Sequence, residues 1–380
     1  MAIYIKGAGM TKFDIDERGS YERVYECVNE ALDSGNISMK EIDAVFVSNC
    51  EPETNGERQR HTGPMISSMF QKRMPIITVP AGCGGGGTAL WNAAEFQKKN
   101  NMRNILVIGF EKLVANLSEN ITDEMFMGGE RIYEQAEGVI FPAQNALVAQ
   151  QYMVKYGATE DDLALVALKN HENAFLNPKA RFYGKKVTLE MIKKSPVVAS
   201  PLRLFDCSIS VDGAAAAIIS DEKSDIEITG SSLYADRISA FESKDMTSWA
   251  ATRLAAESAY QQAGITPKDI DFVELHDAFT SVELMAYEDL GFAERGEGKK
   301  LIKKGITKMN GKLPVNTSGG LKAKGHPISA TGVSQIYEIV KQMRKQAGKR
   351  QIDNAGTGLA HNVGGVGSTV TVHIMKYVGG

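Results

Sequence analysis

Residues 20–49, "SYERVYECVNEALDSGNISMKEIDAVFVSN", have a second copy at residues 248–277, "SWAATRLAAESAYQQAGITPKDIDFVELHD". The two stretches align without a gap and share seven identical residues. Each copy begins with a serine suited to N-capping, continues with apolar residues at helical spacing, breaks near a glycine and ends in a short apolar strand. Two ordinary helix–strand units that agree by chance are the alternative, but seven identities favour an internal duplication.

The composition indicates a folded protein of enzyme size. The chain has 380 residues, 43% of them hydrophobic, and a formal net charge of -3, which provides no basic face for nucleic acid. No apolar run approaches the roughly 18 residues that span a bilayer, and the N-terminus resembles a strand and loop more than a signal peptide. We therefore expect a cytoplasmic protein with no membrane or nucleic-acid partner.

Four cysteines are scattered along the chain without a CxxC pair: Cys27, Cys50, Cys83 and Cys207. This spacing argues against both a zinc ribbon and a disulfide framework. We expect reduced thiols and no metal site.

Strand and helix signals alternate along the rest of the chain, which predicts an α/β fold of layered sheets covered by helices. Between Phe110 and Gly213 lie roughly a hundred residues rich in Met, Phe, Tyr, Asn and Lys, and an excursion of this length from a compact sheet is usually functional. We expect it to form a loop domain that lies over the first half.

The stretch "VPAGCGGGGTAL", residues 79–90, sets Cys83 among five glycines at the start of an expected helix. Gly82, Gly84 and Gly87 match the GxGxxG pattern of dinucleotide-binding loops, although a run of glycines matches this pattern easily. The competing interpretation is a nucleophile, because a helix N-terminus lowers the pKa of a thiol and its backbone N–H groups can hold an oxyanion. A small buried cysteine is the third possibility, and the loop alone does not decide between them.

A thiolate nucleophile needs acid–base partners. Three of the six histidines lie at strand ends or turns, where the binding and catalytic residues of open α/β sheets are usually found. His276 ends a strand in "VELHDAFT", His326 follows a glycine in "GLKAKGHPISATG", and His361 precedes a glycine turn in "LAHNVGGVG". The other three receive no role, with His171 expected to pack in a helix and His373 in a strand.

"AGCGGGGTA", "HDAF", "NTSGGLKAKGHPISATG" and "HNVGG", in this order on a duplicated background, resemble the thiolase superfamily, most closely its sterol-carrier-type and archaeal acetyl-CoA acetyltransferase branch. The resemblance implies a five-layer αβαβα fold built from two βαβαβαββ halves. The N-terminal half would cover residues 1–225, with the loop domain inserted at about 115–205, and the C-terminal half would cover residues 226–380.

The resemblance also implies roles for the matching residues. Cys83 matches the nucleophile that takes up the acyl group as a thioester, and His326 matches the histidine that draws the thiol proton and then holds the thioester oxygen. His276 matches the position where many relatives carry an asparagine that fixes a water in the oxyanion hole. Backbone N–H groups at Cys83 and near Gly364 would form a second oxyanion hole, and substrate-binding residues are expected at Asn316, Ser318 and Gly319.

One feature departs from the family pattern. Ordinary thiolases carry a second cysteine in a CxG turn near the C-terminus as the base that removes the α-proton, and here His361 stands approximately at that position. Relatives with the same HN sequence carry a compensating cysteine in HDCF, but this chain has Ala278 there. We hypothesise that His361 is the base, since an imidazole is a competent base near neutral pH. The alternative is that His361 braces the turn and His326 serves as both acid and base.

The resemblance implies an acetyl-CoA C-acetyltransferase that interconverts two acetyl-CoA with acetoacetyl-CoA and CoA, needs no cofactor and assembles as a homodimer or homotetramer. The resemblance to the archaeal branch implies HMG-CoA synthase of the mevalonate pathway as a partner, with a small OB-fold/zinc-ribbon protein as a bridge. The CoA cradle is expected among the basic residues of the loop domain, such as Lys179, Arg181, Lys185 and Arg203. The alternatives are a thiolase-like enzyme for longer acyl-CoA, a non-catalytic acyl-CoA scaffold and, from the glycine pattern, a nicotinamide dehydrogenase.

Overall fold

The computed structural model describes residues 2–379 except 51–56, 58, 101 and 115–124. Nine strands form one mixed sheet in the order β3-β2-β4-β7-β1-β8-β11-β10-β9. Only Tyr4 and Ile5 of β1 pair with β8, opposite Glu227 and Ile226, so the sheet has two halves joined at a narrow seam. The strands of the first half are β1 (Tyr4–Met10), β2 (Ala44–Ser48), β3 (Ile76–Thr78), β4 (Asn104–Glu111) and β7 (Gly213–Ser220), and those of the second are β8 (Ile226–Ala235), β9 (Phe272–Leu275), β10 (Thr357–Gly364) and β11 (Thr369–Tyr377).

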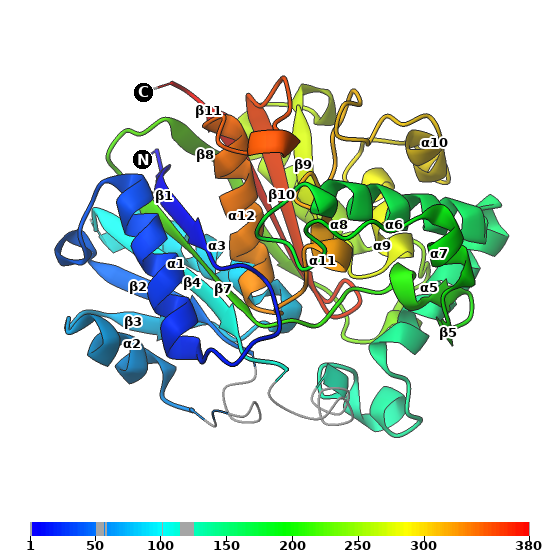
Figure 1. The fold of residues 1–380 in the computed structure, drawn as a ribbon, viewed down its shortest axis with the longest axis horizontal. Helices are drawn as coiled ribbons and strands as arrows, with labels where there is room; N and C mark the ends of the chain where they lie inside the picture. Colours follow the sequence, from blue (N-terminus) through cyan, green and yellow to red (C-terminus); the bar gives the residue numbers. More distant parts are fainter. Residues whose placement is uncertain (1, 51–56, 58, 101, 115–124, 380) are drawn as a thin grey trace.

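Two helices, α3 (Gly85–Asn100) and α12 (Ala330–Met343), pack against each other in the centre of the molecule and contact strands of both half-sheets. Helix α1 (Ser20–Gly35) covers the outer face of the first half, beside α2 (Thr62–Phe70) at the sheet edge. Helix α8 (Ala250–Ala263) covers the outer face of the second half, and α9 (Thr280–Asp289) packs against α8. The layers are therefore helix, sheet, paired helices, sheet and helix, as expected (Figure 1).

Each central strand is buried on both faces, which explains its nearly continuous apolar sequence. In β4, Ile105 and Val107 lie in the cluster around the central helices, whereas Leu106 and Ile108 lie in the cluster under α1. The alternation of side chains along a strand produces this division. The core therefore consists of one layer on each side of each half-sheet.

The duplicated segments have the same structure in both halves. Helix α1, a short 3-10 turn at Met39–Glu41 and strand β2 in the first copy correspond to α8, a 3-10 turn at Pro267–Asp269 and β9 in the second. Both turns begin with a capping box, from Ser38 and Thr266, which ends the loop and starts the strand at the same place. The internal duplication expected from the sequence is thus present in the fold.

The long excursion between β4 and β7 contains α5 (Phe141–Tyr156), α6 (Glu160–Phe175), α7 (Leu189–Lys194) and the short pair β5 (Val197–Ala199) and β6 (Leu202–Arg203). We expected it to lie over the first half, and this was wrong. Helices α5 and α6 pack on α9, α10 (Gly298–Lys303) and α11 (Gly320–Ala323) of the second half, on the right of Figure 1. Tyr152 and Val166 are buried there in the second half's core, in one cluster with apolar side chains of α9.

Candidate active site

The glycine run packs helix α3 against its neighbours. A side chain at Gly86 would collide with the backbone of α12 near Ser329, and one at Gly87 would collide with Thr371 of β11. Gly332 of α12 faces Gly86 and Gly87 with equally little room. The glycines therefore permit close approach of the two central helices. The dinucleotide-loop interpretation of this run is wrong, because Thr371 and Asn362 fill the space beside Gly87, the last glycine of the pattern.

Cys83 lies where this packing ends. Cys83 belongs to the 3-10 turn Gly82–Gly84 at the N-terminus of α3. Gly82, the first residue of this turn, has a φ of 51°, and no atom would lie within 4 Å of a Cβ added to it. The Cys83 side chain is half-buried, and it is placed where the partial positive charge of the helix end favours a thiolate. Gly364 lies against this turn, since a side chain there would come within 3.1 Å of the Gly84 nitrogen. The expected neighbourhood of Cys83 and Gly364 is present.

His276 and His326 lie together. His276 follows β9 directly, and His326 lies between α11 and α12. Their rings meet edge to face with centroids 5.3 Å apart. His326 Nδ1 is 2.7 Å from Thr331 Oγ1, and His276 Nδ1 is 3.3 Å from Asn362 Nδ2. The fold thus brings two of the three candidate histidines into contact.

Burial keeps these imidazoles neutral. It lowers the pKa of His326 to about 3. Burial also lowers the pKa of His276 well below its ordinary value, together with repulsion from Lys322 and from His326 and His361 whenever those rings are protonated. At neutral pH each ring therefore has one N–H donor and one lone pair. Such rings can accept a proton or hold an oxyanion.

The structure places His361 elsewhere. Its side chain is fully buried on the face of β10 that carries Leu359 and Val363, and its Nε2 lies 3.2 Å from Thr252 Oγ1 on α8. That face is the outer one, whereas α3 and Cys83 lie on the inner face. The hypothesis that His361 is the catalytic base does not agree with this geometry, because side chains alternate along a strand and the inner position belongs to the next residue.

That next residue, Asn362, is the one the sequence analysis missed. Asn362 Nδ2 donates to the Cys83 carbonyl oxygen at 2.9 Å, and Asn362 Oδ1 accepts from the Gly87 backbone N–H at 3.0 Å. A single side chain therefore links the Cys83 turn to His276. Strand alternation in "GLAHNVGG" was the available signal: Gly358, Ala360 and Asn362 share a face, and Ala360 belongs to the central core.

The three residues expected to bind substrate are fully buried and bonded inside the protein. Asn316 Oδ1 accepts from the Leu275 backbone N–H at 2.8 Å, and Ser318 Oγ donates to Glu274 at 2.5 Å. Gly319, with a φ of 105°, packs on Ala174 with no room for a side chain. These contacts hold the segment before α11 and His326 against β9 and α6. The geometry gives these three residues a supporting role and not a direct contact with substrate.

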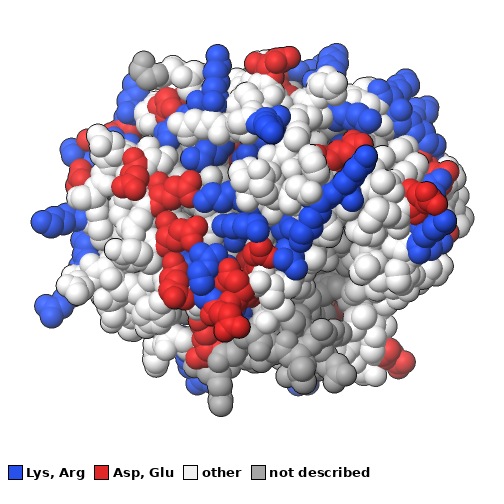
Figure 2. Space-filling model, viewed as in Figure 1, with Lys and Arg blue, Asp and Glu red and all other residues white. Residues whose placement is uncertain are grey.

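Three of the four basic residues expected to cradle CoA are ion-paired within the protein, and the fourth, the exposed Lys185, lies over the Phe182 ring. Lys179 pairs with Glu30 at 2.8 Å, Arg181 with Asp14, and Arg203 with Glu160 at 3.3 Å. On the face seen in Figure 2, Lys and Arg side chains are interspersed with Asp and Glu. Their present contacts are those of a solvated, ion-paired surface.

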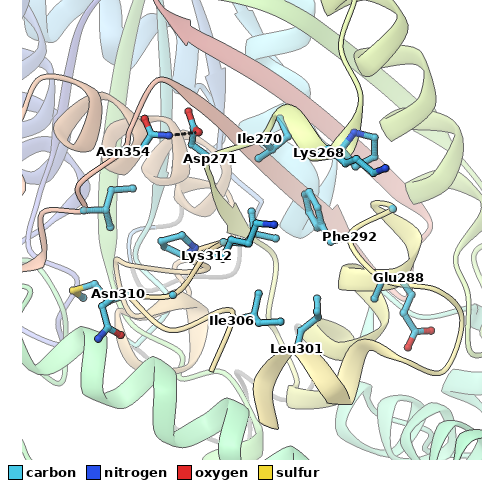
Figure 3. Close-up of a pocket in the computed structure, with 18 of the residues that line it drawn as sticks. Lys268, Ile270, Asp271, Glu288, Phe292, Leu301, Ile306, Asn310, Lys312 and Asn354 are labelled. Carbon is cyan, nitrogen blue, oxygen red and sulfur yellow. Dashed lines mark hydrogen bonds between the residues drawn. The ribbon is translucent and has the colours of Figure 1, made fainter. Parts of the chain in front are cut away.

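One groove among the described residues, about 1050 Å³ in volume, is not at this site. It lies around Ile270 and Asp271 at the beginning of β9, with Phe292, Ile306 and Lys312 on its walls (Figure 3). His276 follows the opposite end of β9, and neither Cys83 nor a site histidine lines the groove. Chemistry, not cavity size, therefore identifies the candidate active site.

The described residues contain no helix long and apolar enough to cross a membrane. Within the same part of the chain, no three His, Cys, Asp or Glu side chains are grouped as metal ligands.

Comparisons with known proteins agree with this geometry. The families "Thiolase, N-terminal domain" and "Thiolase C-terminal domain-like" match residues 3–223 and 233–377. An acetyl-CoA acetyltransferase of Methanothermobacter thermautotrophicus is 36% identical over 98% of this chain and 99% of its own, and sterol carrier protein 2 of Bos taurus is 32% identical over 98% and 72%. The solved "Ltp2-ChsH2(DUF35) aldolase" shares the fold with a TM-score of 0.85 at 23% identity, over 99% of this chain and 98% of the matched chain. These matches extend over nearly the whole chain, and the chain belongs to the thiolase family of acyltransferases.

Proposed function

We propose that this protein is an acetyl-CoA C-acetyltransferase that interconverts two acetyl-CoA with acetoacetyl-CoA and CoA through an acetyl-Cys83 intermediate. The observation that carries the proposal is the continuous contact from the Cys83 turn through Asn362 to His276 and His326. The similarity to an archaeal acetyl-CoA acetyltransferase along the full length of both chains supports this choice of substrate.

In the first half-reaction, Cys83 Sγ attacks the thioester carbonyl of acetyl-CoA while His326 takes the thiol proton. The C–S bond to CoA breaks, and His326 returns the proton to the departing CoA thiolate. A neutral imidazole at neutral pH can do this, which is the state that burial of His326 favours.

In the second half-reaction, a second acetyl-CoA loses an α-proton and its enolate attacks the carbonyl carbon of acetyl-Cys83. The Cys83 thiolate leaves as acetoacetyl-CoA forms. Because His361 lies on the outer face of β10, we assign the proton to His326, which then acts as acid and base in both half-reactions. No second thiol is needed in this scheme.

Condensation of two acetyl-CoA is uphill, so biosynthetic use needs an enzyme that consumes acetoacetyl-CoA. We propose HMG-CoA synthase of the mevalonate pathway for this role, with a small OB-fold/zinc-ribbon protein as a bridge between the two enzymes, and a homodimer or homotetramer as the working assembly. A cytoplasmic location suits a reduced nucleophilic cysteine.

Incubation with acetyl-CoA followed by mass spectrometry of the intact protein and its peptides tests the proposal. One acetyl group should appear on Cys83, and Cys83→Ala should not acquire it. Wild-type protein that never becomes acetylated, or that is acetylated equally with Cys83 removed, would refute the proposed function. A series of longer acyl-CoA thioesters in the same assay measures the acyl-chain preference.

A further inference from the structure

The side chain of Asn362 has only one possible orientation. Its Oδ1 faces the Gly87 backbone N–H at 3.0 Å, which can only donate, and its Nδ2 faces the Cys83 carbonyl oxygen at 2.9 Å, which can only accept. An amide turned the other way would set two donors and two acceptors against each other. The oxygen and nitrogen of Asn362 are therefore assigned by backbone groups with no freedom of their own.

This orientation determines the protonation of His276. The second proton of Asn362 Nδ2 remains for His276 Nδ1, 3.3 Å away. His276 Nδ1 must then be the lone-pair nitrogen, because an N–H there would face the amide N–H. The ring is neutral, so its single proton lies on Nε2. Within the described residues His276 Nε2 has no hydrogen-bond partner, which leaves this N–H for a ligand.

We propose that Asn362 is a positioning residue that holds His276 in its Nε2–H tautomer, so that His276 donates a hydrogen bond directly to the thioester oxygen as it becomes the enolate oxygen. The inference rests on the proposed condensation and deepens it. His276 then does itself what a water held by an asparagine is expected to do in relatives. A neutral donor that is already oriented in a buried site costs no reorganisation when negative charge develops.

This assignment also gives His276 and His326 different roles in the condensation. A ring fixed as a donor toward substrate cannot take the α-proton at the same nitrogen. His326, whose Nδ1 contacts Thr331 and not Asn362, is free of this constraint. His276 therefore stabilises the enolate and His326 moves the proton.

The tautomer can be read directly. Protein labelled with ¹⁵N-histidine should show His276 as a neutral Nε2–H ring at neutral pH, with the resonance assigned by its loss in His276→Asn. A neutral Nδ1–H ring in the wild-type protein would overturn the proposal. Because the spectrum is recorded on the wild-type protein, this test does not depend on whether an Asn362 variant folds.

Asn362→Asp tests the function of the contact. The carboxylate still accepts from Gly87 but can no longer donate to Cys83 or His276, so the His276 proton should move to Nδ1 and condensation should slow about 100-fold or more through kcat, with KM little changed. Acetylation of Cys83 should persist. Asn92→Asp on α3, whose amide only donates to the Thr88 carbonyl, is the matched control and should leave both spectrum and rate unchanged.

These experiments distinguish a failure of the positioning role of Asn362 from a failure of the proposed acetyltransferase function. Asn362→Asp protein that condenses acetyl-CoA at nearly the wild-type rate, or whose His276 keeps its Nε2 proton, would refute the positioning role. Failure of wild-type protein to acetylate Cys83 would refute the proposed function instead, while the histidine spectrum would still decide the tautomer.

Discussion

The rings of His276 and His326 meet edge to face, 5.3 Å apart, although they come from two different turns of the second half. The two turns hold each other. Asp277 Oδ1 accepts from the Leu321 backbone N–H at 2.7 Å, and Lys322 Nζ donates to the Asp277 carbonyl oxygen at 2.8 Å. The residue after His276 is therefore bonded to residues four and five positions before His326, and these hydrogen bonds hold the two histidines in contact.

The position of His361 leads to a first prediction. Because its ring faces α8, His361→Gln should retain acetoacetyl-CoA synthesis within about tenfold of wild type, whereas His326→Gln should lose on the order of 100-fold or more, as expected for removal of a general acid–base. Steady-state thiolysis and condensation rates of the two variants check this. A His361→Gln enzyme that acetylates Cys83 but cannot condense would restore His361 as the base.

Lys322 leads to a second prediction. Its ammonium group is fully buried and donates to the carbonyl oxygens of Asp206 and Asp277, at 2.9 and 2.8 Å. Lys322→Met would leave both carbonyls without this donor and nearby buried carboxylates without their cation, which should lower the free energy of unfolding by about 3 kcal/mol or more. Urea unfolding midpoints measure this, with the exposed Lys304→Met as the control, expected within about 0.5 kcal/mol of wild type.

The helix contact at Gly87 leads to a third prediction. Its added methyl in Gly87→Ala would press on Thr371 Oγ1 and should cost about 1–3 kcal/mol of stability. Thr371 Oγ1 is buried without a hydrogen-bond partner, so Thr371→Ala removes the obstacle without breaking a bond. The double variant should recover part of the loss in a mutant cycle of unfolding midpoints. Strictly additive effects would show that the close approach of α3 to β11 is not the reason for this glycine.

Acid sensitivity gives a fourth prediction. His171 is buried between Phe182 and Phe205, and burial, with the charge of Lys322, lowers its pKa to about 3. The unfolded chain takes up this proton near pH 6.5, so stability is present above that pH and is lost as pH falls toward about 3.

His171→Leu removes this one proton from the linkage. Its unfolding midpoint should fall less steeply than that of wild type between pH 6.5 and 4.5. The comparison of two proteins cancels the carboxyl groups with opposite behaviour, such as Asp289, whose pKa burial raises to about 6. Identical slopes would mean that His171 takes up its proton in the folded protein.

The sequence by itself determined the two-fold repeat, the position of Cys83 at a helix start and the presence of His276 and His326 at turns. These are local properties, because capping, periodicity and glycine turns depend on neighbouring residues in the chain. Only the tertiary structure decided that the glycines of α3 serve helix packing, that the excursion packs on the second half, and that Asn362 rather than His361 faces Cys83. Each of these depends on which face of a helix or strand meets which partner across a large sequence separation, and a difference of one residue in a strand moves a side chain to the other side of the sheet.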